Sequence, residues 1–570
     1  MDGSELHRRI DKAKWCVTKA DLTQSKLRVR EAVRVGEIEP TTSDCFNPWD
    51  RRIGPSVYTV TQQLIKPVTR KAGNMSWALM LHPEGLPCDL FITHAWREGV
   101  FEFLDKVLHS WPCGARHAYC CMLSNPQNLE IADMICDPSR SPFAVALASA
   151  QHVLVVPNRT TSVYTRLWCV YEAYLAYTSD KTIVVACSHD YAEILLASGW
   201  AALVGCFGIL AGWQRHRLGA RLTWIETQGF WATCAIPIIV AQLVRNAHVC
   251  RCFNLLGAGL TGFFAAVADM PTTNPAHYYR KRSDDVRMER QLLSLALCFY
   301  LMATVDCVRR RAARREWEQL TAGYTGSVQH ARCKVESDEA SIRAEMHGSF
   351  AAVDRAIEVL IRAGMWKRSL RLASQAGVDV KHAGHTEYAL PCTCWSLHFV
   401  TAWFLFGMSD IYGRVLAVTI ALVNVFWVLF LVSTAQDSRV FAIKAACRLA
   451  PVWLLLCILT HAIFVNTLNM TIHDVGYVNL IFTTLLVFDS LCVSVGIAGI
   501  DGVLRMPWCG SFLAQAILAP NCCPGFFACP AFGNDHGNRE GGDGERSRDV
   551  EEAAIKTDGG CESGSMHTSG

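Results

Sequence analysis

The sequence predicts an α/β domain with a parallel sheet, followed by an α-helical polytopic membrane region. Before residue 190, short runs that are apolar throughout alternate with segments of helical periodicity, as in a sheet covered by helices on both faces. After residue 190, apolar stretches of about 20 residues recur. The chain of 570 residues is 51% hydrophobic and 18% charged, with a mean hydropathy of +0.19. Soluble domains usually carry roughly a quarter charged residues, so this composition favours a membrane protein.

Four short runs in the first third of the chain are predicted to be parallel strands. Each is apolar at consecutive positions, which is the pattern of a strand buried on both faces. Open sheets of this type bind ligands beyond the carboxyl ends of their strands, so residues 94–97, 124–130 and 157–160 are expected to share one edge. The predicted strands are residues 89–93, 119–123, 152–156 and 182–187, and the predicted helices are residues 101–111, 141–150 and 164–177.

About eight stretches after residue 190 are long and apolar enough to cross a membrane, because a helix of about 20 residues spans the hydrocarbon layer. Residues 194–213 and 415–434 contain no Asp, Glu, Lys or Arg. Asp489 lies near the middle of another stretch, where a charge is costly unless it faces protein or water. The predicted first cluster, residues 194–308, contains 194–213, 228–244, 252–270 and 291–308, and the second, residues 391–500, contains 391–409, 415–434, 449–468 and 476–500.

Two further segments are polar. Residues 1–56 form an N-terminal segment whose charged start lacks the apolar core of a signal peptide, so we expect this end of the chain in the cytosol with reduced thiols. Residues 309–390, between the two clusters, are predicted to be a soluble helical segment. Its apolar residues recur at helical spacing from Ile342 to Ile361, with Ser337 as N-cap and Gly364 at the end, and predict one helix packed on a core.

The C-terminal part has two segments of its own. Residues 501–533 form a Cys-rich segment beside the second cluster. Its Cys522, Cys523 and Cys529 have no second pair at zinc-site spacing, so no metal site is expected, and palmitoylation is the alternative. Residues 534–570 have too few apolar side chains to form a core and are expected to be disordered. The basic runs of the chain flank apolar segments, which favours membrane anchoring over nucleic-acid binding.

Two motifs in the first domain are similar to those of TIR domains. Residues 89–96 (DLFITHAW) resemble the opening strand and first loop of this family, especially protist TIR-like proteins with a Ser-His-x-Trp version. Residues 166–176 (RLWCVYEAYLA) are similar to a later TIR helix that often carries Trp-Cys followed three residues later by Glu. The resemblance places a TIR-like domain of flavodoxin-like fold at residues 57–190 and leaves the membrane region unexplained. Residues 124–130 are not a clear match to the family's BB loop, so no NAD contacts are transferred to them.

The resemblance implies a catalytic role for one residue, although residues 94–96 depart from the first-loop pattern of many TIR domains. In TIR domains that cleave NAD, the Glu of this motif binds the nicotinamide ribose and is catalytic, which implies that role for Glu172, with NAD as substrate and no bound cofactor. Breaking the bond to nicotinamide builds positive charge on the ribose, and a fixed carboxylate stabilises that charge. Trp168 lies four residues earlier on the same helical face, so it is expected to wall the NAD-binding pocket. His94 and Trp96 are expected at its rim.

Other interpretations of these residues stay open. Trp168 is also compatible with a core aromatic side chain, and His94 with a packed structural histidine. Glu172 is also compatible with a surface charge paired with Arg166 or Lys181. The spacing of the motif alone does not separate catalysis from these structural roles.

Three functions are compatible with the sequence. The first is a membrane-anchored TIR-like signalling protein, whose spans hold copies of the domain close enough to self-associate, with or without NAD cleavage. The second is a channel or transporter with regulatory soluble domains, which Asp489 and His461 inside predicted spans favour and the lack of an obvious repeat between the two clusters disfavours. The third is a non-catalytic TIR scaffold. The lipid bilayer and further copies of the chain are the expected partners.

Overall fold

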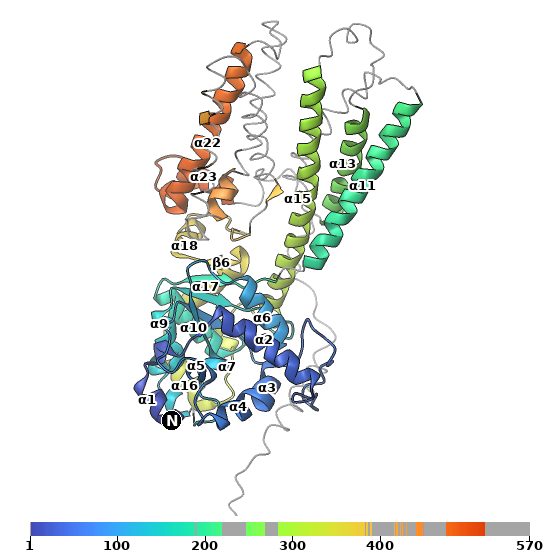
Figure 1. Ribbon diagram of the computed structural model, residues 1–570. Coiled ribbons are helices and arrows are strands. Elements are labelled where there is room, and N and C mark those ends of the chain that lie inside the picture. Colours follow the sequence, from blue (N-terminus) through green and yellow to red (C-terminus); the bar gives the residue numbers. More distant parts are fainter. Residues whose placement is uncertain are drawn as a thin grey trace, which may run out of the picture.

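The described part of the chain consists of an α/β sheet domain and a set of long apolar helices that extend from one side of it (Figure 1). The structure is a computed structural model. It describes residues 2–381 except 131, 189–190, 219–246 and 268–282, together with residues 440–446, residues 475–518 and a few single residues between 382 and 474.

A six-stranded sheet forms the centre of the domain, in the order β1-β3-β2-β4-β5-β6. The four central strands are parallel, whereas each edge strand is antiparallel to its neighbour. The predicted α/β class is therefore confirmed, but the sheet is mixed and not purely parallel. The strands are Val17–Thr18 (β1), Leu90–Thr93 (β2), His117–Cys120 (β3), His152–Val155 (β4), Thr182–Val185 (β5) and Met365–Trp366 (β6).

The two edge strands come from outside the segment predicted to form the domain. β1 belongs to the N-terminal 56 residues, and β6 follows the first group of apolar helices. Each has only two residues, too few to show the period-two pattern by which a strand is predicted. The N-terminal segment and the segment 309–390 are thus parts of the same sheet domain.

Helices cover both faces of the sheet (Figure 1). One face, through Phe91, Tyr119 and Val153, packs against α9, α10, α16 and α17. The other face, through Ile92 and Leu154, packs against α2, α3 and α6. Burial on both faces explains why the central strands are apolar at every position. The helices of the domain are α1 (Gly3–Arg9), α2 (Lys19–Arg34), α3 (Val57–Val60), α4 (Lys66–Lys71), α5 (Trp77–Leu81), α6 (Val100–His109), α7 (Cys121–Ser124), α8 (Ala132–Ile135), α9 (Pro142–Ser149), α10 (Leu167–Thr178), α16 (Glu336–Glu345), α17 (Phe350–Ala363) and α18 (Arg368–Gln375).

Two predicted elements differ from the structure. The strand predicted at 119–123 ends at Cys120, because the Ser124 hydroxyl accepts the backbone N–H of Cys120 (3.0 Å) and turns the chain into α7. The single helix predicted after Ser337 is two helices, since Gly348 adopts a left-handed φ of 81° between them. Val335 and not Ser337 precedes the first of these. Gly364 ends the second, as predicted, with a left-handed φ of 75°.

Two described helices are long and apolar enough to cross a membrane. α11 (Tyr191–Arg217) contains the predicted span 194–213, and α13 (Ala247–Val267) overlaps the predicted span 252–270. The two helices pack closely. A Cβ atom on Gly208 would lie only 2.0 Å from the carbonyl oxygen of Gly259, so this contact requires a glycine. Small residues at such positions let two helix backbones approach one another.

The other predicted spans are described in part or not at all. Residues 291–308 lie within α15 (Ser283–Thr321), which packs against α11 and α13. Residues 476–500 lie within α22 (Val475–Leu504), which is irregular at Gly499 and is followed by α23 (Gly510–Leu518). Outside the described residues lie 228–244, 391–409, almost all of 415–434 and of 449–468, His461, the side chain of Asp489, Cys522, Cys523, Cys529 and the tail 534–570.

Candidate functional site

The candidate site lies where the carboxyl ends of β2 and β4 adjoin. From β2 the chain continues to β3 on one side, and then crosses back to β4 on the other side of β2. An open α/β sheet has its ligand crevice at such a reversal of strand order. Thr93 ends β2 opposite Val155 at the end of β4, so the residues after Thr93 lie at this position.

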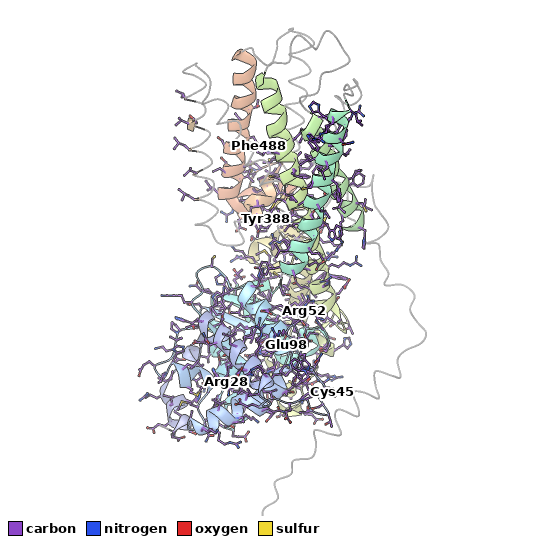
Figure 2. The ribbon with its side chains drawn as sticks, turned by 45° about the vertical axis from the view of Figure 1, so that its right-hand side comes forward. Arg28, Cys45, Arg52, Glu98, Tyr388 and Phe488 are labelled. Carbon is purple, nitrogen blue, oxygen red and sulfur yellow. The ribbon has the colours of Figure 1, made fainter. Side chains whose placement is uncertain are left out.

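A chain of hydrogen bonds joins Glu98, His94 and Cys121 at this edge. His94 Nδ1 lies 2.8 Å from Glu98 Oε1, and His94 Nε2 lies 3.1 Å from Cys121 Sγ. The indole N–H of Trp96 also donates to Cys121 Sγ, at 3.2 Å. The side chains of His94 and Glu98 are buried, and Cys121 is half-buried. Figure 2 shows Glu98 within the sheet domain. His94 and Trp96, both predicted at the rim of a pocket, therefore converge on a thiol.

The electrostatic environment favours a protonated His94. Burial alone lowers the pKa of His94, but its interactions with the thiol of Cys121 and with Glu98 outweigh burial and hold that pKa well above its usual value. Each ring nitrogen of His94 thus faces a hydrogen-bond acceptor, Glu98 Oε1 or Cys121 Sγ, and the imidazolium form can donate to both. The arrangement is a thiol, an imidazole and a carboxylate in series.

Glu172 lies on α10, next to the end of β2. Only 7% of its surface is exposed, and it accepts a hydrogen bond from the Thr93 hydroxyl. Burial raises the pKa of Glu172 to about 7, although the bond from Thr93 and the charges of His94 and Arg166 act to lower it. Its Oε2 atom is buried without a hydrogen-bond partner among the described residues. The interpretation of Glu172 as a surface charge is therefore wrong.

Trp168 belongs to a different set of contacts. Its indole N–H donates to Asp338 of α16 (3.3 Å), and its ring lies 5.2 Å from that of Phe143 on α9. Trp168 thus fills the space between α10 and the helices beside it, which is the core-aromatic alternative. Lys181, which the sequence offers as a partner for Glu172, instead donates to the carbonyl of Ala148 (2.7 Å).

Sequence reasoning missed two members of this site, Cys121 and Glu98. Glu98 follows His94 by four residues in a loop, where no regular spacing predicts that their side chains meet. Cys121 directly follows β3, whereas the apolar run 119–123 predicts that it lies inside the strand. The vicinal pair Cys120 and Cys121 directly after a buried strand was the available signal.

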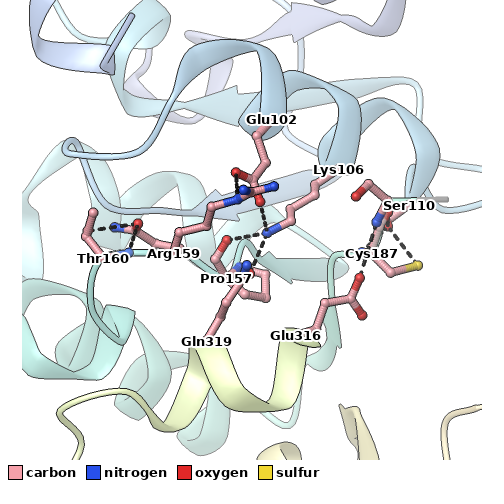
Figure 3. Close-up of polar contacts among 11 residues, drawn as sticks. Glu102, Lys106, Ser110, Pro157, Arg159, Thr160, Cys187, Glu316 and Gln319 are labelled. Carbon is pink, nitrogen blue, oxygen red and sulfur yellow. Dashed lines mark hydrogen bonds and ion pairs between the residues drawn. The ribbon is translucent and has the colours of Figure 1, made fainter. Parts of the chain in front are cut away.

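A second polar cluster attaches the sheet domain to the apolar helices (Figure 3). Lys106 of α6 is 2% exposed and donates to the carbonyl of Pro157 and to Gln319 of α15, both at 2.7 Å. It also pairs with Glu102 at 3.0 Å, and Arg159 pairs with the same carboxylate at 2.6 Å. The loop after β4 is thereby held against α15 through one buried ammonium group.

Glu316 of α15 makes the next contact of this junction. It accepts the backbone N–H of Ser188, just after β5, at 3.2 Å (Figure 3), and burial raises its pKa to about 8. A cavity of about 90 Å³ lies here between the sheet domain, α11 and α15. Arg311 and Arg315 of α15 pair with Glu193 of α11 at 3.6 and 3.7 Å. The junction is thus a dense ionic contact between the domain and the helices.

Fold and site together define an α/β sheet domain with a buried carboxylate and a thiol at its ligand edge, joined to apolar helices. Comparison with known proteins gives no match to a family model, to a curated protein or to a solved structure. Among the described residues, no group of three or more His, Cys, Asp or Glu side chains is placed to hold a metal ion.

Proposed function

We propose that this protein is a membrane-anchored signalling protein whose TIR-like domain cleaves NAD through Glu172. The observation that carries the proposal is the Glu172 carboxylate, buried beside the end of β2 with Oε2 lacking a hydrogen-bond partner among the described residues. The order β3-β2-β4-β5 of the four parallel strands is the flavodoxin-like order, which supports the TIR-like interpretation of the domain.

A single buried carboxylate suits this reaction. When the bond between ribose and nicotinamide breaks, positive charge develops on the ribose, and water then adds to the sugar carbon. An anion held in a water-poor site stabilises that charge more strongly than one in bulk water. Because the pKa of Glu172 is about 7, the carboxylate is ionised mainly above pH 7. The rate of NAD cleavage should therefore rise as the pH increases through 7.

Access to Glu172 is the main requirement of the proposal. The side chain is 7% exposed, so side chains that cover it have to move before a ribose reaches it. The TIR resemblance implies that such enzymes work as assemblies, and clustering of the domains on a membrane would supply the movement. Residues 57–187 alone would lack β1 and β6, so the full chain is the correct material for an assay.

The test is release of nicotinamide from NAD by the full chain, reconstituted at high density in vesicles and compared with the chain in detergent. Glu172→Gln keeps the shape of the side chain and removes the anion, so turnover should fall at least ~100-fold. Glu358→Gln, which alters an exposed carboxylate of α17 paired with Arg362, is the matched control and should leave turnover unchanged. Absence of nicotinamide with the clustered wild type would reject cleavage in favour of a scaffold.

A channel or transporter regulated by the sheet domain is the second candidate. The observation in its favour is α15, which runs without a break from an apolar stretch to the buried contacts of Glu316 and Gln319. Movement of the sheet domain would be transmitted directly along such a helix. Ion flux across the same reconstituted vesicles, with and without NAD, separates this candidate from signalling alone.

A further inference from the structure

We propose that Cys121 is a nucleophilic thiol, activated by His94 and Glu98, that adds covalently to soft carbon electrophiles of the α,β-unsaturated carbonyl class. Cys121 is thus a modification site at the ligand edge of the sheet. This proposal goes beyond NAD cleavage and does not depend on it, because it concerns the sulfur atom and not the carboxylate of Glu172.

The geometry contains the three parts that activate a nucleophile. His94 Nε2 lies 3.1 Å from the sulfur and is placed to take its proton. Glu98 Oε1, 2.8 Å from His94 Nδ1, fixes the orientation of the ring and stabilises the imidazolium. Glu98 acts through His94 and is therefore a positioning residue. The N–H of Trp96, 3.2 Å from the sulfur, is a second donor that stabilises negative charge on it.

The burial of these groups selects Cys121 as the reactive member. The side chains of His94 and Glu98 are 1% and 5% exposed, whereas Cys121 is half-buried. The neighbouring thiols of Cys120 and Cys169 are buried, and burial raises the pKa of each. A buried thiol with a raised pKa is inert, so these two are not expected to compete.

The charged and titratable groups around His94 come from every element packed against it. The anions and thiols favour its protonated form, and the guanidinium of Arg166 interacts with Cys121. The groups facing this position are Glu98 in the loop after β2, Glu102 and Lys106 on α6, which act on Glu98, Tyr119, Cys120 and Cys121 at the end of β3, Arg166 before α10, and Cys169 and Glu172 on α10.

The proposed reaction balances without a further reagent. Transfer of the Cys121 proton to His94 Nε2 gives the imidazolium that the surroundings of His94 favour, and the sulfur then forms a bond to the β-carbon of the electrophile. The π bond between the two carbons breaks, and its electron pair moves toward the carbonyl oxygen. His94 gives the proton to the resulting enolate, so the product is a thioether beside a neutral His94.

The test is the pH dependence of labelling of the full wild-type chain by limiting N-ethylmaleimide, read by mass spectrometry at each cysteine. Cys113, which is exposed, is the reference within the same molecule. Between pH 7.5 and 5.5 its labelling rate should fall about 100-fold, since only the thiolate reacts and an ordinary thiol loses about tenfold per pH unit. The rate at Cys121 should fall less steeply over the same interval, because His94 Nε2 lies within hydrogen-bond distance of its sulfur and takes the proton.

Two variants assign the effect to the proposed residues. His94→Gln should give Cys121 the steep pH dependence of Cys113, and Glu98→Gln should give an intermediate dependence. The wild type alone decides the proposal if either variant fails to fold. A steep wild-type dependence at Cys121, or no labelling of Cys121 at pH 7.5 when Cys113 is fully labelled, would overturn it.

Discussion

Replacing Glu172 with Gln should stabilise the folded protein at high pH and have much less effect at low pH. Burial raises the pKa of Glu172 from 4.5 to about 7 in the folded state. Below pH 4.5 the carboxyl is protonated in both states, and folding carries no penalty. Between pH 4.5 and 7 the unfolded chain releases the proton while the folded chain retains it, so the free energy of unfolding falls as the pH rises.

The magnitude follows from the difference between the two pKa values. From 4.5 to about 7 it corresponds to a full penalty of roughly 3 kcal/mol, at about 1.4 kcal/mol per pH unit. The unfolded chain is already partly ionised at pH 5, so the change between pH 5 and pH 8 is roughly 2.5 kcal/mol. Glutamine does not ionise, and the stability gained by Glu172→Gln should grow by that amount over this interval.

Thermal unfolding of the detergent-solubilised full chain, followed by tryptophan fluorescence at both pH values, measures this difference. A change of 2.5 kcal/mol should appear as a growth of roughly 5–10 °C in the Tm difference between variant and wild type. Glu316 also has a raised pKa, but it is present in both proteins, so its contribution to the stability difference between them cancels. The exposed-site variant Glu358→Gln should show no growth. A Glu172→Gln effect that is the same at both pH values would refute the buried, pKa-shifted carboxylate on which the catalytic proposal rests.

Three further substitutions test the packing of the domain. Lys106→Met should lower the free energy of unfolding by roughly 3 kcal/mol, because it leaves the buried carbonyl of Pro157 unpaired and removes the ion pair between Lys106 and Glu102. An unchanged Tm would contradict this role of Lys106. Gly364→Ala should lower the free energy of unfolding by about 1 kcal/mol more than Gly377→Ala. Both glycines have a left-handed φ, but of the two only Gly364 has a neighbour close to the position of a Cβ atom, the His385 ring at 2.5 Å. Equal urea midpoints for the two variants would count against this. Asp306→Ala should lower the free energy of unfolding by about 2 kcal/mol, because Asp306 accepts hydrogen bonds from the backbone N–H groups of Tyr388 and Ala389 at 2.8–2.9 Å. Hydrogen exchange at those two amides should accelerate in the variant.

Local patterns predicted the central part of the fold. The run at 152–156 is apolar at every position because its strand is buried on both faces, and β4 occupies four of those five residues. Gly364 marked the end of α17 because a left-handed residue closes a helix at low energetic cost when it lacks a side chain. These features depend on neighbours in sequence, which is why the sequence alone reveals them.

Long-range contacts account for what the sequence did not predict. β1 and β6 exist because a two-residue segment pairs with an existing strand, and nothing within two residues marks them as strands. The approach of Cys121 to His94 depends on the lateral pairing of β2 and β3, which no spacing along the chain encodes. Trp168 faces α9 and α16 for the same reason, since its surroundings were set by a helix more than a hundred residues later.

The pairing of β6 with β5 restricts how many times the chain between these two strands can cross a membrane. β5 ends at Val185 and β6 begins at Met365, and strands of one sheet lie on one side of any bilayer. Any crossings of a bilayer by the chain between them must therefore be even in number. If α11, α13 and α15 all cross, a fourth crossing has to accompany them. If the chain crossed an odd number of times, β6 would lie on the opposite side of the membrane from β5. β5 would then be an unpaired edge strand, and such edges pair with strands of other chains and aggregate. Pairing of β6 with β5 would thus select chains that have inserted with an even number of crossings.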